Sequence, residues 1–484
     1  MTASLTLGLL FPGAFSPQDA ALPVGGVTMD SRQVKPGHAF VAYAGAKVDG
    51  ARFIADAVGK GAVAVIGEGP RPEGLPAALP YARLADPRRA LALAAARVHP
   101  RQPGAVVAVT GTSGKSSVAD FTRQIYAALG RTSASLGTIG VVTSSGAQYG
   151  SLTTPDPVTL HATLDRLAGD GVTHLAMEAS SHGLDQRRLD GVRLAAGAFL
   201  NLGRDHLDYH ASMEEYLAAK LRLWDLLPPG APAIVNLDGE RGPDAARAAR
   251  DRGLSLLTVG AQGETIRLLR LEREGFGQRL ELDAAGQRLQ VTLPLPGDFM
   301  AGNALVAAAF AIATGEDPAR AVAAIAGLQG VPGRLQRVGE RKGGLAIVDY
   351  AHKPDALAAV LATLRPYATG RLICVFGCGG DRDKGKRPIM GRIAVEGADV
   401  AIVTDDNPRT EAPARIRAEI LAGAPGAIEI GDRAAAIRHA VALLGPGDVL
   451  VVAGKGHEPG QTIGDITLPF SDLDETAKAI EELT

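Results

Sequence analysis

The stretch that most constrains the fold runs from Thr110 to Ser117, with the sequence Thr-Gly-Thr-Ser-Gly-Lys-Ser-Ser. It follows the apolar run 104–109, which predicts a buried strand, and it precedes residues 118–129, whose apolar spacing predicts a helix. A strand, a glycine-rich turn and a helix start present backbone N–H groups to a phosphate chain. Lys115 would meet the outer phosphates, and the hydroxyl of Ser116 would reach a Mg²⁺ ion. We therefore predict a nucleotide-phosphate site here.

The loop differs from the common P-loop pattern, Gly-x-x-x-x-Gly-Lys-Ser/Thr, at one position. Val109 replaces the first glycine, which leaves the shorter form Thr-Gly-Thr-x-Gly-Lys-Ser. The loop alone is compatible with a plain strand–helix turn, with a P-loop kinase and with a nucleotide-regulated binding protein. The polar clusters elsewhere in the chain therefore have to decide which kind of protein this is.

The length of 484 residues corresponds to about three domains of ordinary size. Hydrophobic residues make up 46% and charged residues 21%, which is typical of globular domains with packed cores. The net charge of −2 gives no electrostatic reason to expect a nucleic-acid or membrane partner. The two cysteines, Cys374 and Cys378, make no disulfide framework and favour a reduced compartment.

The N-terminus carries no basic segment of the kind that opens a signal peptide. No run reaches the roughly 18 apolar residues that a membrane-spanning helix needs. We expect a cytoplasmic protein without a membrane span, and a monomer.

The order of apolar runs and helical patterns predicts an α/β protein of three domains. Residues 1–88 form a small N-terminal α/β domain. Residues 89–332 alternate buried strands with helices, which favours a mostly parallel sheet covered on both faces, with a short antiparallel insertion at about 255–295. Residues 333–484 form a Rossmann-like domain whose strands run into polar or glycine-rich loops, where such sheets bind ligands.

Three polar features follow the phosphate loop in the central domain. Glu178 ends a predicted strand, and its carboxylate with the Ser116 hydroxyl would suit Mg²⁺; a surface loop is the alternative. His206, in the dense polar cluster 201–210, could bind a second metal, unless this is a solvated loop. Lys220 lies in a helix that opens with a capping box, where a lysine is more often a solvated surface residue.

Two strand ends of the last domain combine both signs of charge. Residues 376–387 form a glycine-rich stretch followed by mixed charges, and Asp405 to Arg409 stop at a proline. Rigid turns that offer both signs could recognise a ligand with ammonium and carboxylate groups. A solvated strand end is the alternative.

Taken together, these motifs resemble the Mur ligase family in their order along the chain. They comprise the phosphate loop, Thr153 to Asp156, Glu178 to Leu184, Asn201 to His210, Tyr216 to Lys220, Asp349 to Asp355 and Gly454 to Glu458. An Asp-Ser-Arg module around Ser31 adds to the likeness and resembles the uridine-diphosphate-binding domain of these ligases. In that module the family often has His where this chain has Ala51.

The resemblance implies residue roles. The UDP-sugar peptide would be bound by Ser31, Thr153, Thr154, Ser180, Gln186 and Arg188. ATP would be bound by Gly111, Thr112, Ser113, Gly114, Lys115, Ser116, Ser117, Asn303, Arg334, Asp349 and His352. Mg²⁺ would be held by Ser116, Glu178, His206 and Lys220, with Lys220 converted by CO₂ into a carbamate. The catalytic set would be Lys115, Lys220, Glu178 and His206.

The turn Asp-Asn-Pro-Arg resembles that of family members that add meso-diaminopimelate. Its ligands would be Arg382, Asp406, Asn407, Pro408, Arg409, Gly454 and Glu458. The implied activity is ATP-dependent amide formation between meso-diaminopimelate and UDP-N-acetylmuramoyl-L-alanyl-D-glutamate, through an acyl phosphate, in peptidoglycan biosynthesis. A lysine-adding ligase and a folylpolyglutamate synthase are the nearest alternatives.

Overall fold

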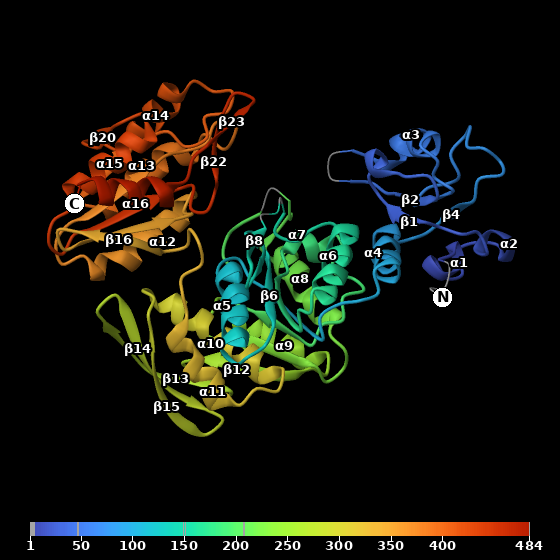
Figure 1. The fold of residues 1–484 in the computed structure, drawn as a ribbon, viewed down its shortest axis with the longest axis horizontal. Coiled ribbons are helices and arrows are strands. Elements are labelled where there is room, and N and C mark those ends of the chain that lie inside the picture. The colour runs from blue at the N-terminus through green and yellow to red at the C-terminus, as the bar shows by residue number, and fades with distance from the viewer. Residues whose placement is uncertain (1–4, 46–47, 149, 151, 207–208, 484) are drawn as a thin grey trace. The chain divides into compact units, whose positions relative to one another are not determined.

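The computed structural model describes residues 5–45, 48–148, 150, 152–206 and 209–483. The chain divides into two compact units, and Figure 1 labels their helices and strands. The first unit comprises Met1–Leu268, Leu282–Leu289 and Gly302–Ala324. The second comprises Leu269–Glu281, Gln290–Ala301 and Ile325–Thr484.

The N-terminal part of the first unit is built on a parallel four-stranded sheet in the order β1-β2-β3-β4. Its strands are β1 (Gly26–Thr28), β2 (His38–Ala42), β3 (Ala64–Gly67) and β4 (Tyr81–Arg83). Its helices are α1 (Leu7–Leu10), α2 (Pro17–Ala20), η1 (Ser31–Gln33), η2 (Gly50–Phe53), α3 (Ile54–Gly59) and α4 (Pro87–Val98). The predicted domain boundary at residue 88 falls in the first turn of α4 and stays a prediction.

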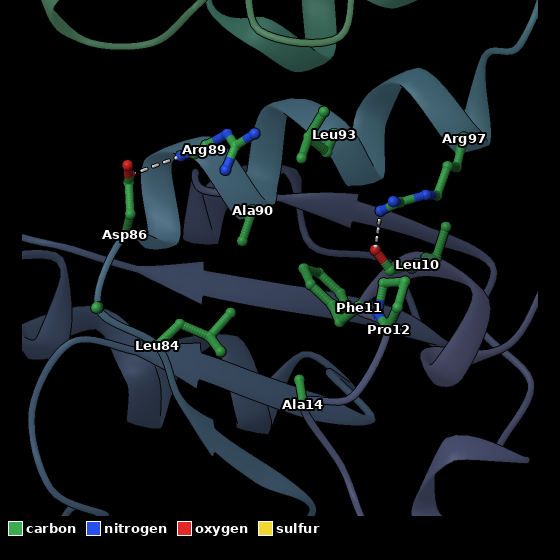
Figure 2. Close-up of a pocket in the computed structure, with 11 residues that line it drawn as sticks. Leu10, Phe11, Pro12, Ala14, Leu84, Asp86, Arg89, Ala90, Leu93 and Arg97 are labelled. Carbon is green, nitrogen blue, oxygen red and sulfur yellow. Dashed lines mark hydrogen bonds between the residues drawn. The ribbon is translucent and has the colours of Figure 1, made fainter.

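A cavity of about 360 Å³ lies under α4 (Figure 2). Leu10, Phe11 and Leu93 give it apolar walls, and Arg89 and Arg97 lie along the same helix. Ser31 is not among its lining residues, so this cavity is separate from the predicted uridine contact.

In the first unit the central sheet runs in the order β12-β11-β10-β5-β9-β6-β7-β8, and it continues past β12 into the strands that follow in sequence. Its strands are β5 (Ala105–Thr110), β6 (Ser133–Gly137), β7 (Gly140–Thr143), β8 (Gly146–Gln148), β9 (His174–Glu178), β10 (Ala196–Phe199), β11 (Pro232–Asn236) and β12 (Ser255–Gly260). Neighbours pair in parallel from β12 to β6, and the β6–β7 and β7–β8 pairs are antiparallel. The carboxyl ends of β5, β9 and β10 therefore meet at one edge.

Most helices of this region lie between successive strands of the sheet, and the last three follow β15 (Gln287–Leu293) in the chain. The helices are α5 (Lys115–Ala128), α6 (Pro157–Gly169), α7 (Ser181–Asp185), α8 (Met213–Leu221), η3 (Arg222–Leu226), α9 (Gly242–Asp251), α10 (Asp298–Ala313), α11 (Pro318–Ala323) and η4 (Ala324–Gly327). No helix in the described part of the chain is long and apolar enough to span a bilayer.

The antiparallel insertion predicted at 255–295 is wrong in its first strand. β12 pairs in parallel with β11, from Ser255 opposite Pro232 to Val259 opposite Asn236, and so belongs to the main sheet. The next pairing is parallel as well, because Val259 and Gly260 of β12 lie opposite Ile266 and Arg267 at the start of the following strand. A short apolar run does not distinguish parallel from antiparallel strands, and this limited the prediction. The three following strands, β13 (Ile266–Glu274), β14 (Gly277–Ala284) and β15 (Gln287–Leu293), are joined by two-residue connections, which only antiparallel strands permit.

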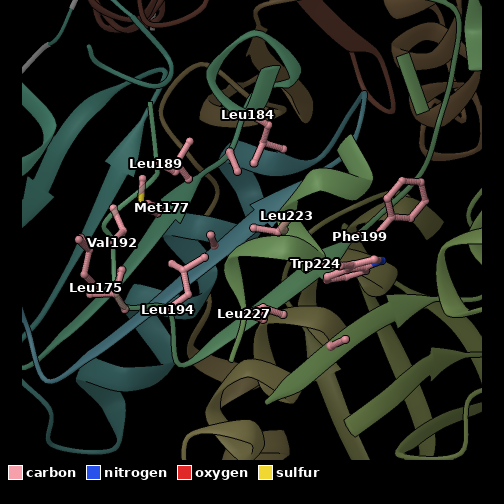
Figure 3. Packing of buried hydrophobic residues seen from close by; sticks show 14 of the residues in the cluster. Leu175, Met177, Leu184, Leu189, Val192, Leu194, Phe199, Leu223, Trp224 and Leu227 are labelled. Carbon is pink, nitrogen blue, oxygen red and sulfur yellow. The ribbon is translucent and has the colours of Figure 1, made fainter. Parts of the chain in front are cut away.

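The apolar core of the central region fixes the strands whose ends carry the polar clusters. Phe199, Leu223 and Trp224 pack in the same buried cluster as Leu175 and Met177 of β9 (Figure 3). Large apolar side chains in a close-packed interior leave little room for strand movement. The ends of β9 and β10 are therefore held by packing rather than by the loops themselves.

The second unit contains a six-stranded sheet in the order β16-β17-β21-β18-β19-β20. Its strands are β16 (Gln336–Arg341), β17 (Gly344–Asp349), β18 (Leu372–Phe376), β19 (Val400–Val403), β20 (Ile428–Glu429) and β21 (Val449–Ala453). Only the β16–β17 pair is antiparallel among these described strands. The Rossmann-like prediction is thus confirmed, with one antiparallel edge strand added.

The remaining elements of the second unit connect these strands or follow them. They are α12 (Pro354–Leu364), η5 (Arg365–Tyr367), α13 (Lys386–Gly397), α14 (Pro413–Leu421), α15 (Arg433–Leu443), the hairpin β22 (Gly460–Ile463) and β23 (Ile466–Pro469), and α16 (Asp472–Leu483). The hairpin follows β21 directly, so it lies at the carboxyl edge of the sheet, where the predicted ligand loops are.

Candidate active site

The phosphate loop connects β5 to α5, as the sequence predicts. Gly114 is the N-cap of α5 with φ of +89°, and a Cβ there would lie 2.6 Å from Oδ1 of Asn303. A Cβ on Gly111 would lie 2.9 Å from Cβ of Leu200. Both glycines are therefore needed, one for its left-handed conformation and both for the close approach of neighbouring residues.

Asn201, at the end of β10, binds the loop from the side. Its Oδ1 accepts hydrogen bonds from the backbone N–H groups of Thr112 (3.1 Å) and Ser113 (3.0 Å). These two donors are therefore engaged within the protein, which leaves the amides at the start of α5 to face a phosphate. Sequence reasoning placed Asn201 in a polar cluster but gave it no role.

Two lysines converge on one carbonyl oxygen of the loop. Lys115 Nζ and Lys220 Nζ each donate to the carbonyl of Gly111 at 2.8 Å. Lys220 is only 1% exposed, and its Nζ lies 4.2 Å from the ring centroid of Tyr216. The alternative of a solvated surface lysine is therefore wrong.

Burial also changes the protonation of Lys220. Loss of solvation lowers the pKa of Lys220 well below its ordinary value, and the positive charge of Lys115 lowers it further, against the attraction of Asp205. A buried amine with a lowered pKa is present as the neutral nucleophile over a wider pH range.

Glu178, at the end of β9, is 2% exposed, so the surface-loop alternative is wrong for this residue as well. One carboxylate oxygen accepts from Ser116 Oγ at 2.8 Å and from the Thr138 N–H at 2.7 Å. The other accepts from Thr138 Oγ1 at 3.2 Å. Gly137 has no side chain, which leaves room for this carboxylate.

The pair Ser116–Glu178 fits a Mg²⁺ ion, because a carboxylate and a hydroxyl are the hard oxygen ligands that Mg²⁺ takes beside water and phosphate. Thr138 was missed by sequence reasoning. It directly follows the last residue of β6, and one of its two contacts with the Glu178 carboxylate is made by its backbone N–H.

His206 lies in a cluster of histidine and tyrosine rings that includes His182 and Tyr216. It has φ of +54°, its Nε2 is 3.5 Å from Oδ2 of Asp205, and its ring centroid is 4.8 Å from that of His182. Its ring is also 6.1 Å from Tyr216, the residue that packs under Lys220. Leu207 and Asp208 of this predicted cluster lie outside the described residues.

Within the described ranges, no group of three or more His, Cys, Asp or Glu side chains is arranged to hold a metal ion. The four predicted metal ligands fall into two pairs. Ser116 and Glu178 share a hydrogen bond. His206 and Lys220 each pack against the ring of Tyr216. The metal roles of His206 and Lys220 stay predictions.

The residues predicted to hold the sugar peptide form one hydrogen-bonded group beside Glu178. Thr154 Oγ1 donates to the Glu178 carbonyl at 3.0 Å and accepts from Ser180 Oγ at 3.0 Å. Arg188 donates to the Thr154 carbonyl at 2.6 Å and to Gln186 Oε1 at 2.7 Å. Burial lowers the pKa of Arg188, but a guanidinium stays charged at neutral pH.

Thr153 and Ser31 complete this predicted set. Thr153 reaches the Thr138 hydroxyl at 3.0 Å, which ties the group to the Glu178 carboxylate. Ser31 lies apart, in η1, where its carbonyl accepts from Lys60 Nζ at 3.1 Å. Ala51, in η2, donates its N–H to Asp49 Oδ1 at 2.9 Å and offers no side-chain donor.

In the second unit, Arg334, Asp349 and His352 surround Tyr350. The Arg334 guanidinium lies 4.4 Å from the Tyr350 ring centroid, and its Nε is buried without a hydrogen-bond partner among the described residues. Asp349 accepts backbone N–H groups from Leu335 and Ala351, and burial raises its pKa. Burial disfavours the charged form of His352 as well and therefore lowers its pKa. The Nδ1 of His352 lies 2.9 Å from the Tyr350 carbonyl oxygen.

The unpaired donor of Arg334 fits an anionic ligand such as a phosphate. Asn303, in the first unit, likewise has a buried Nδ2 without a partner among the described residues. The predicted ATP contacts thus include two donors that the protein itself leaves unused.

The predicted diaminopimelate ligands lie around the ends of β19 and β21. Asn407 Nδ2 donates to Glu458 Oε2 at 2.9 Å, and a Cβ on Gly454 would lie 2.9 Å from Asp406 Oδ2. Arg409 has φ of +52° and donates to the Gly380 carbonyl at 2.8 Å. Pro408 lies between Asn407 and Arg409 in this turn.

Arg382 is exposed on the adjoining glycine-rich loop, where its only hydrogen bond among the described residues is to the Asp381 carbonyl at 3.4 Å. A Cβ on Gly379 would lie 2.8 Å from Arg409 NH1 and 3.9 Å from Arg382 Cγ. The two arginines therefore border the same glycine.

Three family models match the chain in succession. They are "Mur ligase family, catalytic domain" at residues 23–99, "Mur ligase middle domain" at 109–311 and "Mur ligase, glutamate ligase domain" at 333–456. The chain belongs to the Mur ligase family. Members of this family use ATP and Mg²⁺.

Similar Mur ligases cover nearly the whole chain. The UDP-N-acetylmuramoyl-L-alanyl-D-glutamate–2,6-diaminopimelate ligase of Bradyrhizobium diazoefficiens is 57% identical over 96% of this chain and 97% of its own. The ligase of the same name from Zymomonas mobilis is 45% identical over 98% of each chain.

A solved structure of a ligase with that name matches with a TM-score of 0.73 at 33% identity, covering 99% of both chains. The MurF ligase of Thermotoga maritima, solved in complex with ADP, matches at 19% identity with a TM-score of 0.60 over 94% of this chain and 97% of its own, which shows the fold alone. The three-domain Mur ligase fold expected from the sequence is thereby confirmed.

Proposed function

We propose that this Mur ligase joins meso-2,6-diaminopimelate to UDP-N-acetylmuramoyl-L-alanyl-D-glutamate at the expense of ATP. The observation that carries the chemistry is the convergence of Lys115 and Lys220 on the Gly111 carbonyl beside the buried Ser116–Glu178 pair. The substrates are supported by the 57% identity to a ligase of that name and by the Asp-Asn-Pro-Arg turn. Residues 1–88 would bind the uridine part, 89–332 ATP and 333–484 the amino acid.

The reaction would proceed in two steps. A carboxylate oxygen of the D-glutamate side chain attacks the γ-phosphorus of ATP, the bond to the β–γ bridging oxygen breaks, and ADP leaves. The diaminopimelate amine then attacks the acyl phosphate carbon, loses a proton and expels inorganic phosphate, which leaves the amide. Both steps build negative charge on oxygen.

Lys115 and Arg334 would offset that charge at the phosphates. Ser116 and Glu178 would hold Mg²⁺, which neutralises phosphate charge when bound. Asp349 would meet the ribose and His352 the nucleotide, in addition to the backbone contacts that these residues already make. Thr153, Thr154, Ser180, Gln186 and Arg188 would hold the muramoyl peptide, with Ser31 on the uridine part.

Lys220 would be carbamylated in the active protein. Its neutral amine, favoured by burial and by Lys115, attacks the carbon of CO₂, one C=O bond becomes C–O⁻, and the nitrogen loses a proton to solvent, so the neutral amine becomes a carbamate anion. That anion would attract the Lys115 ammonium. Together with His206 it would provide ligands for a metal ion. A ¹³C carbamate resonance with ¹³C-labelled CO₂, absent in Lys220→Ala, would support this; no resonance in the parent protein would refute it.

Phosphate release with the UDP-muramoyl dipeptide and ATP tests the main proposal. Release is expected with meso-diaminopimelate, and far less with lysine or with no amino acid. Equal release with both amino acids would refute the specificity, and release with neither would refute the ligase activity. The cytoplasmic location and the monomeric state stay predictions.

A further inference from the structure

Lys455, at the end of β21, is a buried cation that the roles assigned so far do not use. Its side chain is 0% exposed. Its Nζ donates to Asn407 Oδ1 at 2.9 Å and to Glu458 Oε2 at 3.2 Å, and it lies 3.7 Å from Asp406 Oδ1. A buried ammonium is tolerated only when its donors and its charge are matched, and here an amide and two carboxylates match them.

Lys455 and Thr462 together fix the side-chain amide of Asn407. Its Oδ1 accepts from Lys455 Nζ and from the Thr462 N–H, each at 2.9 Å, so both lone pairs are engaged. Two donors on one atom also fix which end of the amide is oxygen, and they turn Nδ2 toward Glu458. The amide oxygen of Asn407 is therefore part of the framework and is closed to a ligand.

Lys455 also contacts the carboxylate of Glu458. Its Oε2 accepts from both Asn407 and Lys455, whereas the described residues supply no hydrogen bond to its Oε1. The side chain is 33% exposed, so a ligand can reach it. Lys455 thus engages one carboxylate oxygen of Glu458 and leaves the other for an incoming ammonium group.

The same contacts continue to Arg409. The Arg409 N–H donates to the carbonyl of Thr462 at 3.1 Å, and Thr462 is the residue whose own N–H binds Asn407. In the return direction, the Gly464 N–H donates to the Arg409 carbonyl at 2.7 Å. The left-handed backbone of Arg409 is therefore held by the hairpin that Lys455 anchors through Asn407.

We propose that Lys455 is a positioning residue for amino-acid specificity: it orients Glu458 toward the ammonium of the bound amino acid and, through Asn407, holds Arg409 for the distal carboxylate. This inference rests on the proposed function. It gives one buried lysine control over two recognition groups of opposite charge.

Steady-state kinetics of the full chain with Lys455→Met test the inference. The KM for meso-diaminopimelate should rise about tenfold or more, while the KM values for ATP and for the UDP-muramoyl dipeptide change by less than about twofold. The preference for meso-diaminopimelate over lysine should fall as well. Lys478→Met, on the exposed face of α16, is the matched control and should behave like the parent protein.

An unchanged KM for meso-diaminopimelate in an active Lys455→Met protein would overturn the inference, and so would equal rises in all three KM values. If Lys455→Met does not fold, Lys455→Gln, which keeps an N–H donor for Asn407 and removes the charge, carries the same expectation and the same contradiction. Failure of the parent protein to release phosphate with meso-diaminopimelate would instead refute the proposed function.

A double-mutant cycle separates positioning from general stability. If Lys455 acts through Glu458, the effect of Lys455→Met on the KM for meso-diaminopimelate should be smaller in a Glu458→Gln background than in the parent. Fully additive effects would overturn the proposed route through Glu458.

Discussion

Lys220 in the first unit and Lys455 in the second are both buried lysines next to predicted ligand loops, yet their surroundings are opposite. Lys220 shares one neutral carbonyl with a second lysine, and its pKa is lowered well below the ordinary value. Lys455 is enclosed by two carboxylates and an amide. An amine without a matching anion is poised for chemistry, whereas a matched ammonium orders its partners. Lys220 is therefore suited to reaction, and Lys455 is suited to ordering the groups that recognise a ligand.

The largest effect is expected at the first of these lysines. Lys220→Ala should lower kcat by about 10³-fold, because it removes the proposed carbamate from the phosphate loop. The measurement is phosphate release at saturating substrates, with Lys478→Ala as the control. A loss of less than about tenfold would show that Lys220 is not part of the chemistry.

A substitution in the recognition turn should affect selectivity more than turnover. Arg409→Ala should lower kcat/KM for meso-diaminopimelate by about 100-fold, because a distal carboxylate would lose its cation. The KM for ATP should stay unchanged. Initial rates with meso-diaminopimelate and with lysine check this, and an intact preference for meso-diaminopimelate would place its recognition elsewhere.

A smaller effect, on the Mg²⁺ requirement, is expected from Thr138, which hydrogen-bonds to the predicted metal ligand Glu178. Thr138→Val keeps the shape and the backbone N–H but removes the hydroxyl that binds Glu178 and Thr153. The Mg²⁺ concentration for half-maximal activity should rise about tenfold, the usual cost of losing a group that orients a metal ligand. Thr138→Ser, which keeps the hydroxyl, should restore the parent value. An unchanged Mg²⁺ dependence in the valine variant would argue against a metal at Glu178.

The last expected effect is on stability rather than on activity: a pH dependence at Lys220. The folded-state pKa lies below the unfolded value, so the unfolded chain binds the extra proton and this lysine destabilises the fold more as pH falls. Between the two pKa values, parent stability should rise relative to Lys220→Met by about 1.4 kcal/mol per pH unit. Urea unfolding in CO₂-free buffers from pH 7 to 9 measures this. If the difference in unfolding free energy between the parent and Lys220→Met does not change with pH, Lys220 keeps its proton in the folded state.

Much of the fold was predictable because the signals are local. The phosphate loop, the strand ends at Glu178 and Asp406, and the capping box before Lys220 each depend on a few neighbouring residues. The parallel pairing of β12 with β11 was not predictable, since a four-residue apolar run carries no information on its partner.

The missed site residues share a physical reason. Asn201 and Thr138 act through hydrogen bonds that involve backbone N–H groups, and the role of Lys455 depends on its burial. Neither backbone hydrogen bonds nor burial can be read from composition or residue spacing. Lys455 stood within a recognised motif, but a lysine in a loop is usually exposed. Only the three-dimensional contacts show that Asn407 serves the framework rather than the ligand.

The most direct test of the central claim is a competition experiment with the intact protein. It is incubated with ATP, Mg²⁺, the UDP-muramoyl dipeptide and equimolar meso-diaminopimelate and lysine, and the nucleotide products are resolved by mass. We predict one dominant product that carries diaminopimelate, formed together with equal amounts of ADP and phosphate. Comparable amounts of the lysine product, or ATP consumption without any amide product, would contradict the account.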